Sequence, residues 1–184
     1  TQRVKRANNA RWIGWPRCDR GPAMSDIVLL DTSVYLNVLD VPGFNQTREE
    51  ILHTFSGRVQ HGDYFLLPMA TIWESGDHIA DLTDGRLRRQ FAQALVEQVT
   101  QAFNNQTPFK TTYFPDREVF LRWLVDFPDY AQRNKSNRQT REGVSLSDLS
   151  IVKEWEQTRD RHSMSRVLIW SLDIDLSAYD TGIR

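Results

Sequence analysis

The stretch Ile27-Val28-Leu29-Leu30-Asp31-Thr32-Ser33 decides the fold. Its apolar run is typical of a strand buried on both faces, as in parallel sheets covered by helices. The strand ends in a carboxylate, which is costly to bury unless it is paired or bound to a cation. Because ligands of open α/β sheets bind at the carboxyl ends of the strands, Asp31 is the first candidate site residue. The same residues also fit a plain helix start, in which Thr32 or Ser33 caps the helix and Asp31 points to water.

Composition limits the class of protein. The 184 residues are 40% hydrophobic and 26% charged, which suits one globular domain with its own core. The net charge of −1 excludes a global basic field, so any surface for nucleic acid has to be local. The single cysteine, Cys18, excludes an intramolecular disulfide and fits a reducing, cytoplasmic compartment. No apolar run approaches the roughly 20 residues that span a bilayer.

Residues 1–23 differ from the rest of the chain. They contain several Lys and Arg residues and a single acid, Asp19. We expect a basic extension that is disordered, or that is not native because Met24 would serve as a start; an RNA-binding arm is the alternative. The folded domain is expected to cover residues 24–184.

Strands and helices alternate along the domain. Apolar runs predict strands over 27–30, 63–68 and 166–171 and a short strand over 110–114. Apolar spacing predicts helices over 33–39, 47–55, 70–82, 87–103 and 117–127 and a sixth that opens at Ser145. Gly57 and Pro128 are expected to end two of these helices, and 129–143 is expected to be a loop. This alternation predicts a three-layer α/β/α fold with a central, mostly parallel sheet.

Several aromatic residues are expected to pack in the core. The longest helix repeats apolar residues every four positions, up to Phe103. The tryptophans of the domain lie on apolar stripes or on a strand, so core packing accounts for them better than base stacking. They are Trp73, Trp123, Trp155 and Trp170.

Acidic side chains are predicted to meet at one edge of this sheet. Asp31 and Asp173 each follow a strand, and Glu74 lies in the helix that leaves the same edge. Asp148, which opens the helix before the last strand, is less firmly placed. Carboxylates gathered without a basic partner repel one another unless a divalent cation neutralises them. Oxygen ligands without His or Cys suit Mg²⁺ or Mn²⁺, which can orient water for attack on a phosphodiester.

The same acids carry a resemblance to a known family. The segments around Asp31, Glu74, Asp148 and Asp173 resemble the ordered acidic motifs of the PIN domain, over about residues 26–180. The resemblance implies a Mg²⁺- or Mn²⁺-dependent ribonuclease, and the VapC-like toxin of a type II toxin–antitoxin pair. It further implies an RNA substrate, a cognate antitoxin and a homodimer, and a cytoplasmic protein without a membrane anchor.

The resemblance also implies roles for individual residues. Asp31, Glu74, Asp148 and Asp173 match the catalytic and metal-binding acids, and Asp175 matches an auxiliary metal-binding acid. Ser171 matches a position that is often a small hydroxyl residue, so it is a candidate substrate-binding residue. Asp77 competes with Glu74, and Asp175 competes with Asp173. The loop 129–143 and the helix 87–103 are longer than the corresponding segments expected in a compact toxin.

A basic run is the candidate surface for RNA phosphates. It consists of Arg133, Lys135, Arg138 and Arg141. Solvated charge is the plain alternative, and Arg86, Arg88 and Arg89 could extend the same surface. The absence of G-x-G-x-x-G after the first strand argues against a dinucleotide-binding enzyme. The remaining alternative function is a catalytically silent PIN-like module that binds RNA or docks a partner.

Overall fold

The computed structural model describes residues 25–134, 142–173 and 176. The predicted extension 1–23 and the site candidates Lys135, Arg138, Arg141 and Asp175 lie outside the described residues. The elements in chain order are β1 (Ile27–Leu30), α1 (Thr32–Leu39), α2 (Arg48–His61), β2 (Tyr64–Leu67), α3 (Met69–Ala80), α4 (Gly85–Phe103), β3 (Phe109–Thr111), α5 (Arg117–Gln132), α6 (Leu146–Arg161) and β4 (Val167–Trp170).

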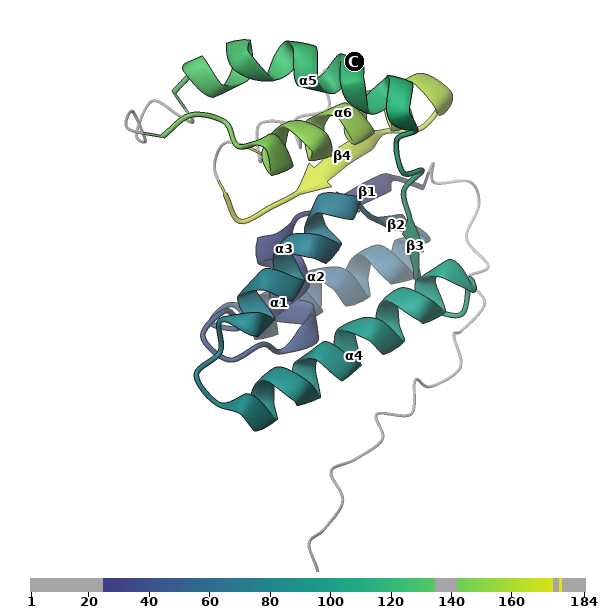
Figure 1. The fold of residues 1–184 in the computed structure, drawn as a ribbon. Coiled ribbons are helices and arrows are strands. Elements are labelled where there is room, and N and C mark those ends of the chain that lie inside the picture. Colours follow the sequence, from purple (N-terminus) through teal and green to yellow (C-terminus); the bar gives the residue numbers. More distant parts are fainter. Residues whose placement is uncertain (1–24, 135–141, 174–175, 177–184) are drawn as a thin grey trace, which may run out of the picture.

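The described strands form one parallel sheet. Their order is β3-β2-β1-β4, and every pairing between neighbours is parallel. Helices cover both faces of this sheet, with α1, α2 and α4 below it and α5 and α6 above it in Figure 1. The predicted three-layer α/β/α class is therefore confirmed, and all strands end at the same edge.

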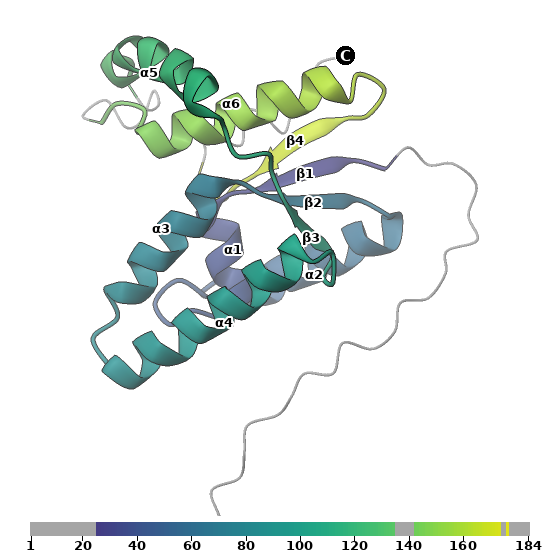
Figure 2. The same ribbon diagram turned by 45° about the vertical axis from the view of Figure 1, so that its right-hand side comes forward.

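The strand that decides the fold is buried on both faces. Val28 and Leu30 pack with the residues of α1, α2 and α4, whereas Ile27 and Leu29 pack with those of α6. Figure 2 shows the helices on the two faces of the sheet. Because successive side chains of a strand point to opposite faces, four consecutive apolar residues supply two cores at once.

Helix α3 connects the two helical layers. It starts at the carboxyl end of β2 and contacts α1 and α4 on one side and α6 on the other. It therefore passes the sheet edge at which the strands end. An acid on its inner side is placed next to the ends of β1 and β4.

Two helix ends differ from the prediction. Helix α2 runs through Gly57 and ends at Gly62, whose φ of +91° suits a left-handed cap. Helix α5 runs through Pro128, so residues 129–132 are helical and the loop expected over 129–143 starts later. Contacts of the Tyr130 ring stabilise the last turn of α5. The centre of this ring lies 4.7 Å from the guanidinium of Arg133, which follows the helix, and 5.6 Å from the ammonium of Lys153 on α6.

Two aromatic side chains expected in the core are exposed. Trp73 is 64% exposed, because α3 buries Thr71, Ser75 and Ile79, and position 73 lies on the opposite side of the helix. Phe103 is 53% exposed, because α4 buries Ala102 instead in its last turn. The expectation holds for Trp123, which is buried, whereas Trp155 and Trp170 are partly buried.

Candidate functional site

Asp31 stands at the junction of β1 and α1. It is only 7% exposed, and its Oδ2 accepts hydrogen bonds from the Ser33 amide at 3.3 Å, the Ser33 hydroxyl at 2.6 Å and the Ser171 hydroxyl at 2.8 Å. Asp31 is thus itself the N-cap of α1, in place of Thr32 or Ser33. All three bonds use one oxygen, and Oδ1 takes part in no hydrogen bond between described residues.

Hydroxyl groups bind the segment after β4 to the end of β1. The Ser171 hydroxyl donates to Asp31 and accepts a hydrogen bond from the Asp173 amide at 2.9 Å. The Ser33 hydroxyl accepts from the Leu172 amide at 3.0 Å. Ser171 therefore positions two acids, and nothing in this geometry requires that it contact a substrate.

Glu74 faces the same edge from α3. Its Oε2 accepts a hydrogen bond of 2.7 Å from the Thr32 hydroxyl. One turn earlier, the buried Thr71 hydroxyl donates to the Leu30 carbonyl at 2.7 Å and so fixes α3 against the end of β1. Asp77, the competing candidate, is exposed and does not line the cavity to which Glu74 belongs. The geometry therefore favours Glu74.

Asp148 takes part in the cap of α6. The Ser145 hydroxyl accepts from the Asp148 amide at 3.0 Å, and the Asp148 carboxylate accepts from the Ser145 amide at 3.4 Å. This reciprocal pair is a capping box, as the sequence indicated. The capping role and the site role do not exclude each other, because Asp148 also lines the cavity described next.

The candidate acids line a single cavity of about 390 Å³. It lies at the carboxyl ends of β1 and β4, and its acidic lining residues are Asp31, Glu74, Asp148 and Asp173. We call it the acidic cavity. No Lys or Arg is among its described lining residues, and no ion pair between described residues involves Asp31 or Glu74. His78 also lines it and packs against Phe44 at 4.6 Å between ring centroids, in keeping with a packing role.

The donor set fits a hard divalent cation, but its arrangement is not that of a closed site. Carboxylate and hydroxyl oxygens are what Mg²⁺ and Mn²⁺ prefer. Across the described part of the chain, however, no three His, Cys, Asp or Glu side chains form a group that could hold a metal ion as they stand. Glu74 and Asp148 instead accept hydrogen bonds from Thr32 and Ser145. A bound cation would therefore have to accommodate these hydrogen bonds or compete with them.

The hydroxyl residues of the cavity were not predicted as site residues. Thr32, Ser33 and Ser145 all line it, and each adjoins or lies near a candidate acid in the sequence. The sequence signal was present, because Asp-Thr-Ser and Ser-x-x-Asp offer hydroxyl donors beside a carboxylate. They were interpreted only as helix caps.

The basic residues predicted to contact RNA do not line the acidic cavity where the structure describes them. The Arg133 guanidinium lies over the Tyr130 ring, and Arg86 pairs with Asp84 at the start of α4. The Arg88 guanidinium donates to the Leu82 carbonyl. The RNA-contact hypothesis for these residues stays a prediction.

Comparison with known proteins adds little to this picture. No protein-family model matches the chain, and no curated protein matches it. Among solved structures, the chain is similar to the crystal structure of FitAcB from Neisseria gonorrhoeae, with 18% sequence identity and a TM-score of 0.47. The match covers 83% of this chain and 91% of that chain. A likeness at this level does not assign the chain to a family. Within its described residues, no helix is both long and apolar enough to cross a membrane.

Proposed function

We propose that this protein is a Mg²⁺- or Mn²⁺-dependent endoribonuclease of the PIN-like type. The observation that carries the proposal is the acidic cavity, in which four carboxylates line the carboxyl edge of a parallel sheet and neither Asp31 nor Glu74 forms an ion pair with a described residue. Such a surplus of negative charge is unfavourable by itself and becomes favourable around a divalent cation. Ligands of open α/β sheets bind at this edge.

The residues of the acidic cavity would have separate roles. Asp31, Glu74, Asp148 and Asp173 would hold the metal, with Asp175 as an auxiliary acid. The bound cation would supply an activated water and stabilise the negative charge that develops on the phosphodiester. The Ser33 and Ser171 hydroxyls donate to Oδ2 of Asp31 and so would position the side chain that holds the cation. The Thr32 hydroxyl orients Glu74 in the same way.

A catalytically silent PIN-like module is the second candidate function. It is favoured by the lack, among the described residues, of three acids arranged as a metal site. In that case the protein would bind RNA or dock a partner without hydrolysis. The two functions differ in their need for a divalent cation.

The deciding experiment is cleavage of end-labelled tRNA, rRNA and single-stranded DNA by the full chain. We expect cleavage of RNA with Mg²⁺ or Mn²⁺, no cleavage with EDTA, and a loss of at least about 100-fold in Asp31→Asn. Thermal unfolding in EDTA is the control for folding, and we expect Asp31→Asn to remain folded because asparagine is also a favoured N-cap and keeps a side-chain oxygen as acceptor. Equal cleavage by the two proteins, or cleavage that EDTA does not stop, would contradict the proposal.

The toxin assignment extends this proposal to partners. A PIN-like toxin would be a cytoplasmic protein, silenced by a cognate antitoxin and active as a homodimer. Light scattering after size exclusion gives the mass of the protein in solution, and a monomer would contradict the dimer. A small open reading frame directly upstream, whose product abolishes cleavage, is the expected sign of an antitoxin.

The basic run is proposed as an additional contact for RNA phosphates. Neutralising Arg133, Lys135, Arg138 and Arg141 together should flatten the salt dependence of RNA binding, because each phosphate contact releases counterions. An unchanged slope of log Kd against log salt would show that the run plays no part.

A further inference from the structure

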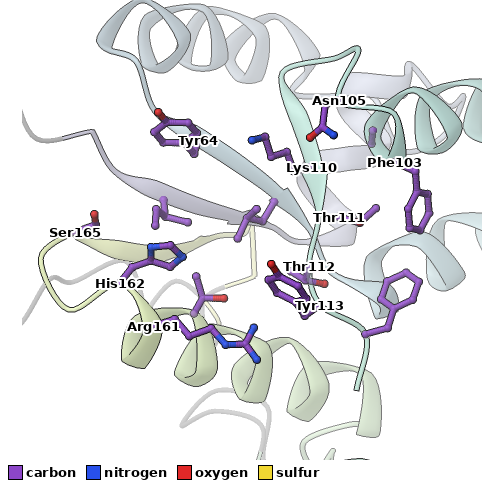
Figure 3. Close-up of a pocket in the computed structure, with 15 residues that line it drawn as sticks. Tyr64, Phe103, Asn105, Lys110, Thr111, Thr112, Tyr113, Arg161, His162 and Ser165 are labelled. Atoms are coloured by element: carbon purple, nitrogen blue, oxygen red, sulfur yellow. The ribbon is translucent and has the colours of Figure 1, made fainter. Parts of the chain in front are cut away.

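A second cavity lies on the sheet face that carries α6. Helix α6 packs on Ile27, Leu29, Val167 and Ile169, which belong to β1 and β4. Among the described residues, the same face of β2 and β3 is only partly covered, with Leu66 half-buried and Tyr64 and Lys110 exposed. Strand register places Leu66 beside Lys110 there, and Ile27 beside Tyr64. The result is a groove of about 720 Å³ between β3 and the last turns of α6, shown in Figure 3.

Two cations, Lys110 and Arg161, are among the described residues of a groove whose other lining residues are mostly apolar or uncharged. Lys110 lies on its floor, and Arg161 and His162 stand on its α6 side. No Asp or Glu is among its described lining residues. In a chain with a net charge of −1, this local surplus of cations selects a negatively charged occupant. Residues 1–23 of the same chain do not fit, because they are basic themselves.

Exposed aromatic rings accompany the cations. Tyr113 is 77% exposed and Tyr64 is 55% exposed, and both line the groove. The Arg161 guanidinium lies 4.7 Å from the centre of the Tyr113 ring, and the Lys110 ammonium lies 6.0 Å from the centre of the Tyr64 ring. Figure 3 shows these two pairs on different sides of the groove. Each pair offers a flat apolar face next to a positive charge.

We propose that this groove binds single-stranded nucleic acid, with bases stacked on Tyr64 and Tyr113 and phosphates held by Lys110 and Arg161. Base stacking on aromatic rings together with a cationic track is how single strands are bound without sequence preference. The hydroxyls of Thr111 and Ser165 add partners for sugar and phosphate oxygens. That the bound strand is RNA rests on the function proposed above. An acidic peptide would match the charge but would have no use for two ring–cation pairs.

The test is fluorescence anisotropy of a labelled 12-nucleotide oligo(U) with the full chain in EDTA, so that no metal-dependent cleavage occurs. We expect Tyr113→Ala and Arg161→Gln each to weaken binding by about tenfold, in line with the worth of one stacked base or one desolvated phosphate contact. Tyr113→Phe keeps the ring and is expected to bind as the wild type does. Arg122→Gln, which removes an exposed charge on α5 outside the groove, is the matched control for charge.

Three results would overturn the inference. They are no binding of oligo(U) by the wild type, equal binding by Tyr113→Ala and Tyr113→Phe, and displacement of oligo(U) by polyglutamate as readily as by unlabelled RNA. Circular dichroism melts guard against misfolded variants, and Tyr113 is exposed enough to be truncated safely. A protein that binds oligo(U) through the groove but cleaves no RNA with Mg²⁺ supports this inference and contradicts the nuclease proposal, so the two failures are distinguishable.

Discussion

The buried Thr71 hydroxyl donates a hydrogen bond of 2.7 Å to the carbonyl of Leu30, the last residue of β1. This bond joins the first turn of α3 to the strand that Asp31 follows. It therefore sets the position of Glu74, one turn further along α3, relative to the other acids of the cavity.

Thr71→Val should loosen that junction. The loss of a buried hydrogen bond costs about 1–2 kcal/mol of stability, and the displaced Glu74 should lower the rate of metal-dependent cleavage. Thr107→Val is the control, because the Thr107 hydroxyl bonds only to Phe109 in the described chain and lines neither cavity. Urea unfolding and cleavage rates measure the two effects. A Thr71→Val protein that loses stability but cleaves at the wild-type rate would contradict the positioning role.

Glu74 and Asp77 provide a matched pair on one helix. Glu74→Gln should reduce cleavage by at least about 100-fold, since it removes one of the charges proposed to hold the cation. Asp77→Asn removes a charge from the exposed side of α3 and should leave the rate within about twofold of the wild type. Cleavage of a labelled RNA at saturating Mg²⁺ compares them. The assignment of Glu74 fails if the two variants lose the same activity.

Added metal should stabilise the folded protein. A ligand that binds only the folded state adds about 3 kcal/mol at 100 times its Kd, so Mg²⁺ should raise the melting temperature relative to EDTA. Asp31→Asn should abolish this rise. Differential scanning fluorimetry over a Mg²⁺ titration measures the shift, and NaCl of equal ionic strength controls for screening. A rise of equal size in the variant would place the bound metal elsewhere.

The buried Glu154 should make the folded protein less stable as the pH rises. Glu154 is 2% exposed, and neither of its carboxylate oxygens has a partner at the usual distance and angle of a hydrogen bond. Burial raises the pKa of Glu154 from 4.5 to about 7, against a partial lowering by the Thr112 hydroxyl and the Met69 amide. The folded state therefore holds this proton more tightly than the unfolded state. Its stabilising effect is complete below about pH 4.5 and is lost as the pH rises to about 7.

Glu154→Gln removes this titration. Relative to the wild type, the variant should gain up to about 3 kcal/mol of stability between pH 4.5 and pH 8, which is the worth of the shift in pKa. Glu156→Gln, at a more exposed position of α6, is the control and should show no such change. Chemical unfolding at the two pH values measures the difference. A difference between wild type and Glu154→Gln that does not vary with pH would contradict the prediction.

Most of the sheet could be predicted from the sequence because β1, β2 and β4 are local apolar runs, whereas β3 (Phe109–Thr111) includes Lys110 and both starts and ends earlier than the predicted range 110–114. An apolar run such as 27–30 packs on both faces, so it needs no alternation and is not mistaken for a surface helix. Asp31 and Asp173, which follow two of these strands, line one cavity for the same reason. Parallel strands have to end at the same edge, and that constraint is topological.

Other features depend on contacts that no local pattern contains. Gly57 and Pro128 weaken a helix by themselves, but α2 and α5 continue through them, and in α5 the Tyr130 ring packs against the Lys153 side chain of α6. Trp73 looked like a core residue because its type is apolar, yet α3 turns it outward. The groove residues Tyr64 and Arg161 lie far apart in the sequence and line the same groove only because α6 covers part of its sheet face.

Helix α6 has the acidic cavity at one end and the groove at the other. Ser145 and Asp148 belong to the first, and Thr158 and Arg161 to the second. Its 16 residues extend over about 24 Å. If a strand is bound in the groove and cut at the acidic cavity, as proposed above, the length of α6 sets the shortest distance between the two positions on that strand. Substrates too short to reach along α6 should be cut much more slowly, and the fragments left by digestion should share a lower limit in size.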